Sequence, residues 1–557
     1  MQLKGAQIVV RTLMEQGVDL VFGFPGATVI DIYDALYDHA DKIRHVLVAH
    51  EQGAAHAADG YARATGKVGV CLATSGPGST NLVTGIAAAF MDSVPIVVVT
   101  GNVATSQIGT DSFQEIDITG VTLPITKHNY FVEDVDELAD TIREAFRLAQ
   151  SGRKGPVLVD IAKDVQQALG EYEPAQAVVP EEPCLADGVV FSDAAACINA
   201  CHRPLVYFGG GVVSAGAEQE LLELADKIDA PIACSLMGIS AVPSSHPRFL
   251  GMEGMHGNYA ATMAMKNADC IIALGCRFSD RSIGNREKFG VGVHIVHVDV
   301  DRSELSKNTN DEYGIVGDVG LAIRKLLQLL RPADHRGWRE LVAKLRADQA
   351  LQQDTREGLT PRAVLAAVDA RRDRDSVVVT DVGQHQMWSA QYLRFDRPRT
   401  FVTNGGLGAM GFGLPAAIGA SLATGRRTLL VVGDGGFGMS LHELATAVST
   451  AAPLTILVMN NGVLGMVRQW QSMFYDKRYA STTLSSYRHT DFVAVAKAFG
   501  ADGMAVDTLE RLEDALTRAE QADGPYLIDC AIGADEFVLP MLSPGGTLGD
   551  IIVKVVG

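Results

Sequence analysis

The chain has 557 residues, which is too long for one hydrophobic core and predicts about three domains. Hydrophobic residues make up 47% of it and charged residues 20%, as in ordinary globular proteins. Lys and Arg number 47 against 66 Asp and Glu, and the resulting net charge of −19 argues against nucleic acid or an anionic membrane as a partner.

The spacing of the cysteines and the character of the N-terminal residues indicate the cellular compartment. The eight cysteines form no Cys-x-x-Cys motif, so the sequence predicts neither a zinc site nor a disulfide framework. Residues 1–7 resemble no signal or transit segment, and no apolar run approaches the length of a membrane span. We therefore expect a protein of the reducing cytoplasm.

Residues 1–170 are expected to form a first α/β domain. Apolar segments of strand length alternate there with helical stretches, which is the pattern of a doubly wound parallel sheet. The expected strands lie at 46–48, 69–73, 95–100 and 156–160. Residues 171–183 follow with three prolines and few core positions, so they are interpreted as a linker.

Two further α/β domains are expected at 188–332 and 358–557, which gives an α/β fold of three doubly wound parallel-sheet domains. The charged, strand-poor stretch 331–358 is interpreted as a second linker. The residues from 535 onward are expected to fold over the site as a tail. No internal repeat is evident in the sequence. Apolar segments of the middle domain lie at 204–211, 270–275 and 294–299.

The most informative motif is Gly433-Asp434-Gly435, followed after 24 intervening residues by Asn460-Asn461. Each half follows an apolar run that reads as a buried parallel strand, at 427–432 and at 454–459. Parallel strands deliver the residues at their carboxyl ends to one crevice. Either half alone is more commonly a turn, whereas the two together indicate a ligand site.

The chemistry of this motif fits a divalent metal and a phosphate group. The carboxylate of Asp434 and the amide oxygen of Asn461 are hard ligands suited to Mg²⁺ or Ca²⁺. Glycines 435, 436 and 438 leave backbone N–H groups free to approach phosphate oxygens. The sequence therefore predicts a site that holds a metal and a diphosphate together.

This motif resembles the signature of thiamine diphosphate-dependent enzymes, in which a metal bridges the diphosphate to the protein. The resemblance implies Mg²⁺ bound by Asp434, Asn461 and the carbonyl of Val463. It also implies cofactor contacts with Val382, Gly383, Gln384, His385, Gly408, Met410, Gly433, Gly435, Gly436 and Met466.

Glu51 lies after the expected strand at 46–48, in a stretch of small residues from His50 to Arg63. A lone glutamate there is more commonly a surface residue, but this stretch resembles thiamine-dependent 2-keto acid enzymes closely. In these enzymes a glutamate protonates the aminopyrimidine ring of the cofactor. Since Glu51 and the metal site belong to different domains, the resemblance implies an active site between subunits of a homodimer or homotetramer.

Three further stretches, 111–120, 277–281 and 465–471, resemble the catalytic subunit of acetohydroxyacid synthase, also called acetolactate synthase, over nearly the full length. The resemblance implies that pyruvate is decarboxylated and its two-carbon unit joined to pyruvate or 2-oxobutanoate. The products are 2-acetolactate or 2-aceto-2-hydroxybutanoate, in the first common step of branched-chain amino-acid biosynthesis. A separate small regulatory subunit is also implied.

The same resemblance assigns substrate roles. Gln114 would lie beside the reacting keto acid as a catalytic residue. Arg281 would bind the carboxylate of the second substrate, since its planar fork pairs bidentately, and Trp470 would shape the acceptor pocket. Without the flanking motifs, an ion pair of Arg281 with Asp280 and a packed Trp470 are the plainer interpretations. Further substrate contacts are implied for Phe113, Lys163 and Ala27.

FAD is implied as well, without a redox role in the main reaction. The turn at Gly209–Gly211 is not a G-x-G-x-x-G fingerprint and is weak evidence by itself. The implied flavin contacts are Arg153, His256, Gly275, Arg277, Asp299 and Asp318.

Three departures from the family pattern are visible. Ala27 stands where most biosynthetic relatives have glycine, and it adds a methyl group where a substrate oxygen approaches. Ser279 replaces an aspartate and Ala162 a proline, and neither removes a proposed catalytic group.

Two other classes of function are left open. One is a flavin-free catabolic acetolactate synthase, or a pyruvate oxidase or decarboxylase, against which Trp470 and 277–281 argue. The other is a non-catalytic, cofactor-holding regulatory partner, against which the intact Glu51, Asp434 and Asn461 argue.

Overall fold

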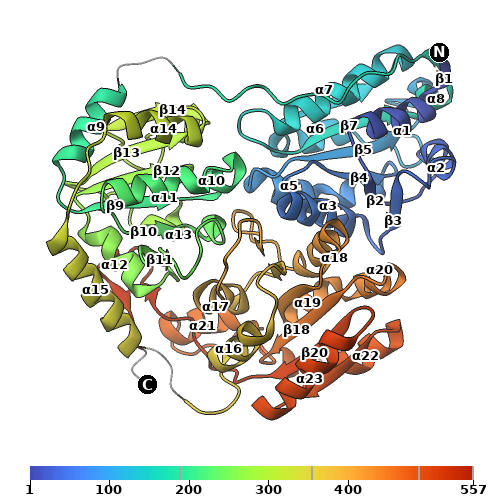
Figure 1. Ribbon diagram of the computed structural model, residues 1–557. Coiled ribbons are helices and arrows are strands. Elements are labelled where there is room, and N and C mark those ends of the chain that lie inside the picture. Colours follow the sequence, from blue (N-terminus) through green and yellow to red (C-terminus); the bar gives the residue numbers. More distant parts are fainter. Residues whose placement is uncertain (187–189, 353–355, 487–489, 555–557) are drawn as a thin grey trace.

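Three six-stranded parallel sheets, each covered by helices on both faces, organise the chain (Figure 1). The computed structural model describes residues 1–186, 190–352, 356–486 and 490–554. Central strands are buried along their whole length because helices cover both sides of each sheet. This confirms the expected fold class.

The first domain carries the sheet order β3-β2-β4-β5-β7-β6. Its strands are β2 (Leu20–Phe24), β3 (Arg44–Leu47), β4 (Gly69–Ala73), β5 (Ile96–Asn102), β6 (His128–Val132) and β7 (Val157–Ala162), and β1 (Gln2–Lys4) pairs antiparallel with β8 (Leu169–Glu171). Its helices are α1 (Gly5–Glu15), α2 (Ile30–Tyr37), α3 (Glu51–Thr65), α4 (Pro77–Asn81), α5 (Val83–Met91), α6 (Ile118–Thr122), α7 (Leu138–Gln150) and α8 (Lys163–Gln167).

The middle domain has the order β11-β10-β9-β12-β13-β14, that of a dinucleotide-binding sheet. Its strands are β9 (Pro204–Phe208), β10 (Ile232–Cys234), β11 (Phe249–Met252), β12 (Cys270–Leu274), β13 (His294–Asp299) and β14 (Tyr313–Val316). Its helices are α9 (Val190–Ala200), α10 (Gly210–Ala215), α11 (Glu218–Lys227), α12 (Tyr259–Asn267), α13 (Asp280–Ile283), α14 (Val319–Leu329) and α15 (Arg336–Leu351).

The third domain has the order β16-β15-β17-β18-β20-β19. Its strands are β15 (Val378–Thr380), β16 (Phe401–Val402), β17 (Thr428–Gly433), β18 (Leu454–Asn460), β19 (Asp502–Val506) and β20 (Tyr526–Ala531). Its helices are α16 (Pro361–Arg371), α17 (Gln384–Tyr392), α18 (Gly413–Thr424), α19 (Asp434–Ser440), α20 (Leu444–Ser449), α21 (Gly465–Phe474), α22 (Phe492–Phe499) and α23 (Leu509–Gln521).

Short 3₁₀ helices complete the chain. They are η1 (Thr105–Gln107), η2 (Leu123–Ile125), η3 (Val135–Glu137), η4 (Leu236–Gly238), η5 (Arg302–Glu304), η6 (Leu441–Glu443) and η7 (Leu484–Ser486).

Helices α3 and α18 join the first domain to the third (Figure 1). The backbone of Ala416 lies where a Cβ on Gly60 would stand, and the backbone of Ala57 lies where a Cβ on Gly419 would stand. Each helix thus contributes a glycine against which the backbone of the other helix packs. Both positions admit no side chain, so the two helices approach as closely as their backbones allow.

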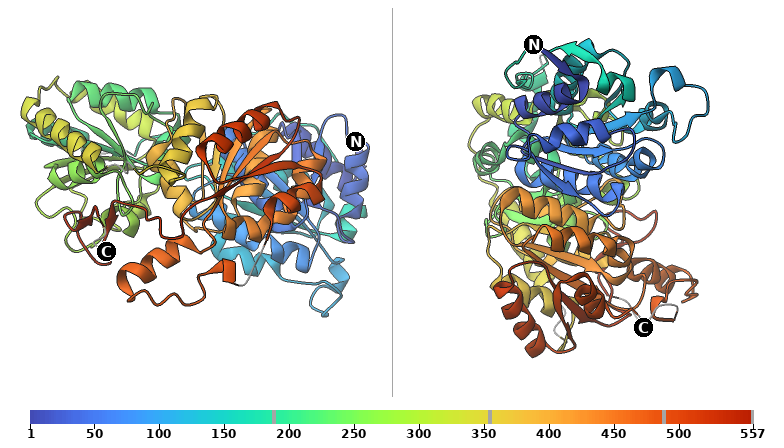
Figure 2. Two further views of the ribbon diagram at one scale, coloured as in Figure 1. Left: turned by 90° about the horizontal axis from the view of Figure 1, so that it is seen from below. Right: turned by 90° about the vertical axis from the view of Figure 1, so that its right-hand side faces the viewer.

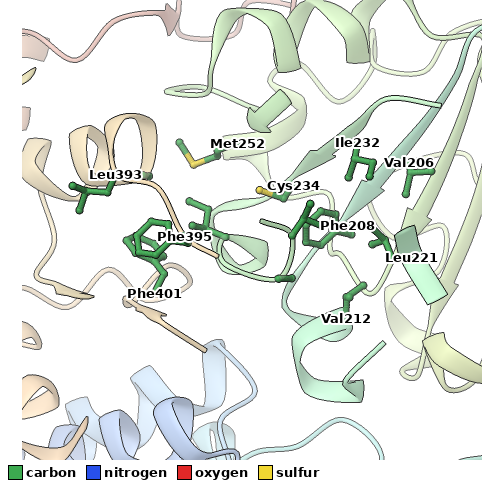
Figure 3. Close-up of a cluster of buried hydrophobic side chains, with 14 of the residues drawn as sticks. Val206, Phe208, Val212, Leu221, Ile232, Cys234, Met252, Leu393, Phe395 and Phe401 are labelled. Carbon is green, nitrogen blue, oxygen red and sulfur yellow. The ribbon is translucent and has the colours of Figure 1, made fainter. Parts of the chain in front are cut away.

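An apolar cluster joins the middle domain to the third (Figure 3). Phe395 and Phe401 of the third domain belong to the same buried cluster as Phe208 and Met252 of the middle domain. The backbone N–H of Phe395 donates to Ser244 Oγ at 2.9 Å, and the N–H of Ser244 donates to the Phe395 carbonyl at 2.7 Å.

The interpretation of residues 331–358 as only a linker is wrong. Arg336–Leu351 form the helix α15, and Trp338 and Leu345 on it are buried in the middle-domain core. The indole N–H of Trp338 donates to the Pro204 carbonyl at 2.9 Å. Charged residues dominate the exposed face of this helix, and two buried positions were too few to reveal its packing.

Residues 535–554 run across the third domain to the middle domain (Figure 2, left). There β21 (Met541–Leu542) pairs antiparallel with β22 (Ile551–Ile552). The N–H of Leu542 donates to the Met255 carbonyl at 2.9 Å, and Gln469 exchanges hydrogen bonds with the backbone of Val538. Within the described residues, none of the helices has the length and apolar character needed to cross a bilayer.

Candidate functional site

One large cavity lies between the middle and third domains and reaches the first domain at Met91–Ser93. Its volume is about 1410 Å³, which exceeds the 300–1000 Å³ or so of a pocket for one small molecule, so it has room for more than one group. Its walls include these residues that the sequence singled out: Arg153, His256, Gly275, Arg277, Arg281, Asp299, Asp318, Val382, Gly383, Gln384, His385, Gly408, Met410, Gly433, Asp434, Gly435, Gly436, Asn461, Val463, Met466 and Trp470.

Asp434 and Asn461 meet because their strands are neighbours. β17 and β18 pair in parallel with Gly433 opposite Met459, so both residues leave the same edge of the sheet. Burial raises the pKa of the Asp434 carboxyl to about 6, a cost that a bound cation would offset. One carboxylate with amide and carbonyl oxygens is the donor set that Mg²⁺ takes beside a phosphate ligand. The residues present therefore fit Mg²⁺.

His385 supplies an unpaired nitrogen to the same wall. Its Nε2 is buried and has no hydrogen-bond partner among the residues that the structure describes. Burial lowers the pKa of His385 to about 4, so the ring is neutral at pH 7. A buried, unpaired ring nitrogen beside Gly433 fits a diphosphate oxygen.

Asp381 shapes the loop that carries Met410, and sequence reasoning missed it. Its carboxylate accepts backbone N–H groups from Gly411 at 3.0 Å and from Gly413 at 2.7 Å. Gly408 and Gly411 have φ values of +70° and +90°, which favour glycine. The available signal was an aspartate directly after an apolar strand, the same pattern that singled out Asp434.

The three domains meet at Asp92, whose side chain is fully buried. It pairs with Arg63 of its own domain at 2.9 Å. It accepts the backbone N–H groups of Gly405 at 3.0 Å and Gly406 at 2.7 Å from the third domain. Arg277 of the middle domain lies 3.9 Å from its other oxygen. Asp92 thus fixes the start of the glycine-rich loop relative to both other domains.

Trp470 and Arg281 line the end of the cavity beyond the metal residues. The Trp470 ring packs edge-on against Phe474, with centroids 5.3 Å apart, and also borders the middle-domain core. Arg281 contacts Met255 Sδ at 3.1 Å. Its ion pair with Asp280, at 3.6 Å, is solvent-exposed and holds the guanidinium weakly.

Glu51 begins α3 in the first domain. Asn81 Nδ2 donates to Glu51 Oε2 at 2.9 Å, which leaves Oε1 beside Gly78. Gly78 lies in the first turn of α4, and Gly76 just before this helix lies against the backbone of Gln114. Glu51 and Gln114 therefore flank one segment, the turn between β4 and α4, although they are 63 positions apart in the sequence.

Lys163 belongs to the same end of the first sheet. Its Nζ donates to the Ala27 carbonyl at 2.6 Å and pairs with Asp31 at 3.2 Å. Phe113, by contrast, is 86% exposed. As far as the structure describes the chain, the walls of the large cavity do not include Ala27, Glu51, Phe113, Gln114 or Lys163. Within one chain, these five first-domain candidates and the metal residues are not brought together.

Glu443 of the third domain fixes the start of α3, and sequence reasoning missed it too. Its buried carboxylate accepts the N–H groups of Ala49 at 3.2 Å and His50 at 3.1 Å. A Cβ on Gly53 would overlap the Glu443 carboxylate. No local signal marks Glu443, because its role depends on the contact between two domains.

The middle-domain end of the cavity fits a dinucleotide such as FAD. The turn at Gly209–Gly211 and Gly275 lie at the carboxyl ends of β9 and β12, where the strand order reverses. Gly211 and Gly275 pack so closely that a Cβ on either would overlap the other's backbone. Arg153 pairs there with Glu304 at 2.7 Å, and Asp318 Oδ1 accepts the N–H of Leu321 at the start of α14.

Comparison with known families agrees with this architecture. Residues 3–121 match the N-terminal TPP binding domain of thiamine pyrophosphate enzymes, 191–326 the central domain and 381–530 the C-terminal TPP binding domain. The chain is therefore a thiamine pyrophosphate enzyme.

Its relatives narrow this class. The chain is 44% identical to the acetolactate synthase large subunit of Mycobacterium tuberculosis, over 99% of this chain and 91% of the relative. It is 43% identical to the acetolactate synthase isozyme 2 large subunit of Escherichia coli, over 99% of this chain and 100% of the relative. It is 41% identical to the probable acetolactate synthase large subunit of Methanocaldococcus jannaschii, over 99% of this chain and 96% of the relative. The chain belongs to the acetolactate synthase large-subunit family.

Proposed function

We propose that this protein is the catalytic subunit of an acetolactate synthase. It decarboxylates pyruvate and joins the two-carbon unit to a second pyruvate, giving 2-acetolactate, or to 2-oxobutanoate, giving 2-aceto-2-hydroxybutanoate. This is the first common step of branched-chain amino-acid biosynthesis. The observation that carries the proposal is the single cavity in which the Asp434 and Asn461 cradle faces Arg281 and Trp470.

Each residue of the site has a chemical task in this reaction. Thiamine diphosphate, when bound, supplies the nucleophilic carbon and the electron sink for decarboxylation. Asp434, Asn461 and the Val463 carbonyl would hold Mg²⁺, and His385 would hold a diphosphate oxygen. Since Asn81 Nδ2 donates to Glu51 Oε2, Oε1 would be the atom that exchanges a proton with the cofactor ring. Arg281 would bind the carboxylate of the acceptor as a bidentate pair.

Water exclusion favours joining the two substrates over simple protonation. Met410, Met466 and Trp470 give this part of the cavity an apolar wall. Residues 535–554 pack behind this wall, where Gln384 Nε2 donates to the Glu536 carbonyl at 2.6 Å and Gln469 Nε2 donates to the Val538 carbonyl at 3.0 Å. Trp470 beside Phe474 limits the space open to the acceptor side chain.

We also propose that the working site is shared between two subunits of a homodimer or homotetramer. The first-domain residues Glu51 and Gln114 lie outside the cavity of their own chain, which supports a site that a second chain completes. Phe113, Leu123 and Ile30 leave apolar surface exposed on the same domain, as expected where a partner subunit packs. A small regulatory subunit and FAD bound in the middle domain complete the proposed assembly.

A cytoplasmic location is part of the proposal. All eight cysteines are free thiols, as a reducing compartment requires.

Product analysis tests the proposed activity. The purified protein, supplied with thiamine diphosphate, Mg²⁺ and FAD, receives pyruvate alone or pyruvate with 2-oxobutanoate. We expect 2-acetolactate from the first and predominantly 2-aceto-2-hydroxybutanoate from the second. Acetolactate alone from both, indifferent to FAD, would assign the protein to the catabolic class. Acetaldehyde or acetyl phosphate as the main product would overturn the proposal.

A further inference from the structure

Glu253 is a buried carboxyl group that the proposed reaction does not use. It follows β11 directly, is 4% exposed and lines the large cavity. Within the part of the chain that the structure describes, no hydrogen bond of normal distance and angle reaches either of its carboxyl oxygens, although the hydroxyl groups of Tyr207 and Ser282 lie beside the carboxyl group. Burying a carboxyl group without partners costs several kcal/mol, so such a group calls for a ligand or another explanation.

The groups around Glu253 leave it without a counter-charge. Tyr207 on β9, Cys234 on β10 and Cys276 after β12 are its titratable neighbours, and burial raises the pKa of all three well above the usual range. The Tyr207 hydroxyl is paired with Ser282 Oγ at 3.0 Å. Burial lowers the pKa of His256 to about 4, and the guanidinium of Arg281 on α13 contacts Met255 Sδ.

In these surroundings Glu253 is a neutral acid at pH 7, because burial raises its pKa to about 8. A neutral carboxyl group presents one O–H donor and one carbonyl acceptor side by side. It therefore matches a ligand edge that offers an acceptor next to a donor.

The strand order places such an edge within reach. A dinucleotide sets its diphosphate where the strand order reverses, here at the ends of β9 and β12. β10 and β11 follow on one side, and Glu253 leaves the end of β11, with its N–H bound to the Cys234 carbonyl at 2.9 Å. Two strand spacings, or about 10 Å, separate β9 from β11. Glu253 therefore lines the same cavity as the Gly209–Gly211 turn, about two strand spacings away from it.

We propose that Glu253 is a direct hydrogen-bonding ligand of the flavin ring, and that its carboxyl group pairs in the neutral form with the imide edge of that ring, which carries an N–H beside a carbonyl. This inference rests on the proposed binding of FAD. It adds a ligand and a pH dependence to that site. As the pH rises through about 8, Glu253 ionises, loses its donor and becomes a buried charge, so FAD affinity falls.

Titration of the flavin-free protein with FAD, followed by flavin fluorescence at pH 6.5 and pH 9, tests the proposal. The full-length variants are Glu253→Gln, which keeps a donor and an acceptor but cannot ionise, and Glu253→Leu, which removes both. We expect Glu253→Leu to bind FAD about 5- to 100-fold more weakly at pH 6.5, the range for lost hydrogen bonds with a buried partner left unpaired. Glu253→Gln should bind nearly as the wild type at pH 6.5 and should not weaken at pH 9.

Asp160→Asn is the matched control. Asp160 is also a buried carboxyl group with a raised pKa, about 7, but it lies in the first-domain sheet. This variant should keep the wild-type FAD affinity at both pH values.

The outcomes separate the two claims. Wild-type protein that binds no FAD overturns the proposed flavin site and this inference with it. Wild-type protein that binds FAD as tightly as Glu253→Leu, or Glu253→Gln that keeps the wild-type pH dependence, overturns the role of Glu253 alone. If Glu253→Leu fails to fold, the pH dependence of Glu253→Gln still decides.

Discussion

The first and third domains are built on one plan and carry different chemistry. Numbered within each domain, both sheets have the strand order 2-1-3-4-6-5. Their equivalent helices α3 and α18 pack on each other through the paired glycines 60 and 419. The equivalent third strands β4 and β17 end differently. One ends at the turn that flanks Glu51 and Gln114, and the other at Asp434 and its glycines.

The same asparagine–aspartate hydrogen bond occurs at equivalent positions of the first and third domains. In the first domain Asn102, at the end of β5, donates to Asp160 on β7 at 2.6 Å. In the third domain Asn460, at the end of β18, donates to Asp529 on β20 at 2.9 Å. The register of both strand pairs is the same, since the asparagine lies two positions beyond the residue opposite the aspartate.

The difference teaches how the chemistry is divided. The third domain offers a buried, glycine-lined cradle for an anionic ligand, and the first offers an acid and an exposed apolar loop. Neither sheet alone has both a metal cradle and a proton-holding group. In the proposed dimer, a pair of like-folded domains from two chains would supply both.

The largest expected effect follows from removing the acid of the first domain. Glu51→Gln should lower kcat roughly 10²- to 10⁴-fold, since a proton-holding group is lost. Mg²⁺ binding and most of the thiamine diphosphate affinity should persist, because the proposed metal and diphosphate ligands lie in the third domain. Steady-state kinetics and calorimetric titration measure the two properties. Glu144→Gln, on the partly exposed face of α7 where Glu144 pairs with Arg147, serves as control and should leave turnover unchanged. Full activity in Glu51→Gln would refute the proposed role of Glu51.

Mixing two defective chains tests whether the domains work across subunits. Glu51→Gln and Asp434→Asn proteins are each expected to be nearly inactive. After co-refolding at equal amounts, half of the dimers are mixed and each mixed dimer has one intact site, which gives about a quarter of wild-type activity. Activity that stays at the level of the separate variants would show that each site lies within one chain.

The paired glycines test the packing of the two domains. Gly60→Ala and Gly419→Ala should each lower the free energy of unfolding by about 1–3 kcal/mol, because a methyl group overlaps the facing backbone. Gly337→Ala on α15 is the control, since a Cβ there meets open space. Urea unfolding measures all three. Equal stability of the variants and wild type would show that α3 and α18 are not in close contact.

The smallest expected effect concerns Asp160, the buried aspartate that corresponds to Asp529 of the third domain. Burial raises the pKa of Asp160 to about 7, so the folded state keeps a proton that the unfolded state releases near pH 4. Wild-type stability should therefore fall as the pH rises from about 4 to 7. Asp160→Asn removes this dependence and gains up to roughly 1.4 kcal/mol per pH unit relative to wild type. Urea unfolding at pH 5, 6 and 7 measures the free energy of unfolding of both proteins. If this free energy changes with pH in the same way for the variant and the wild type, the prediction is wrong. Burial raises the pKa of Asp529 as well, and Asp529→Asn should show the same sign.

Much of the fold could be predicted because buried parallel strands are continuous apolar runs. The runs at 69–73 and 294–299 are β4 and β13 without a shift of their ends. Helix α15 could not be predicted, since most of its surface is exposed and charged. The likeness of the first and third domains was also hidden. Its sequence trace is short, Val157–Ala162 against Tyr526–Ala531, with Asp160 and Asp529 in the same place.

The candidate site divides in the same way. Asp434 and Asn461 could be found because each follows a strand, and neighbouring strands bring them together. Glu443 and Asp92 could not, because their partners lie more than 300 residues away in another domain. Glu253 could not either, since only its burial without partners distinguishes it.

The contacts of Asp92 with all three domains also affect how the domains can separate. Because one buried carboxylate holds Arg63 and the 405–406 turn and lies near Arg277, no domain can leave without exposing its partners. Removing the Asp92 carboxylate would leave Arg63 buried without its partner, which costs about 3–5 kcal/mol, comparable to much of the stability of an ordinary domain. We therefore expect a change at this one side chain to loosen the contacts of all three domains together.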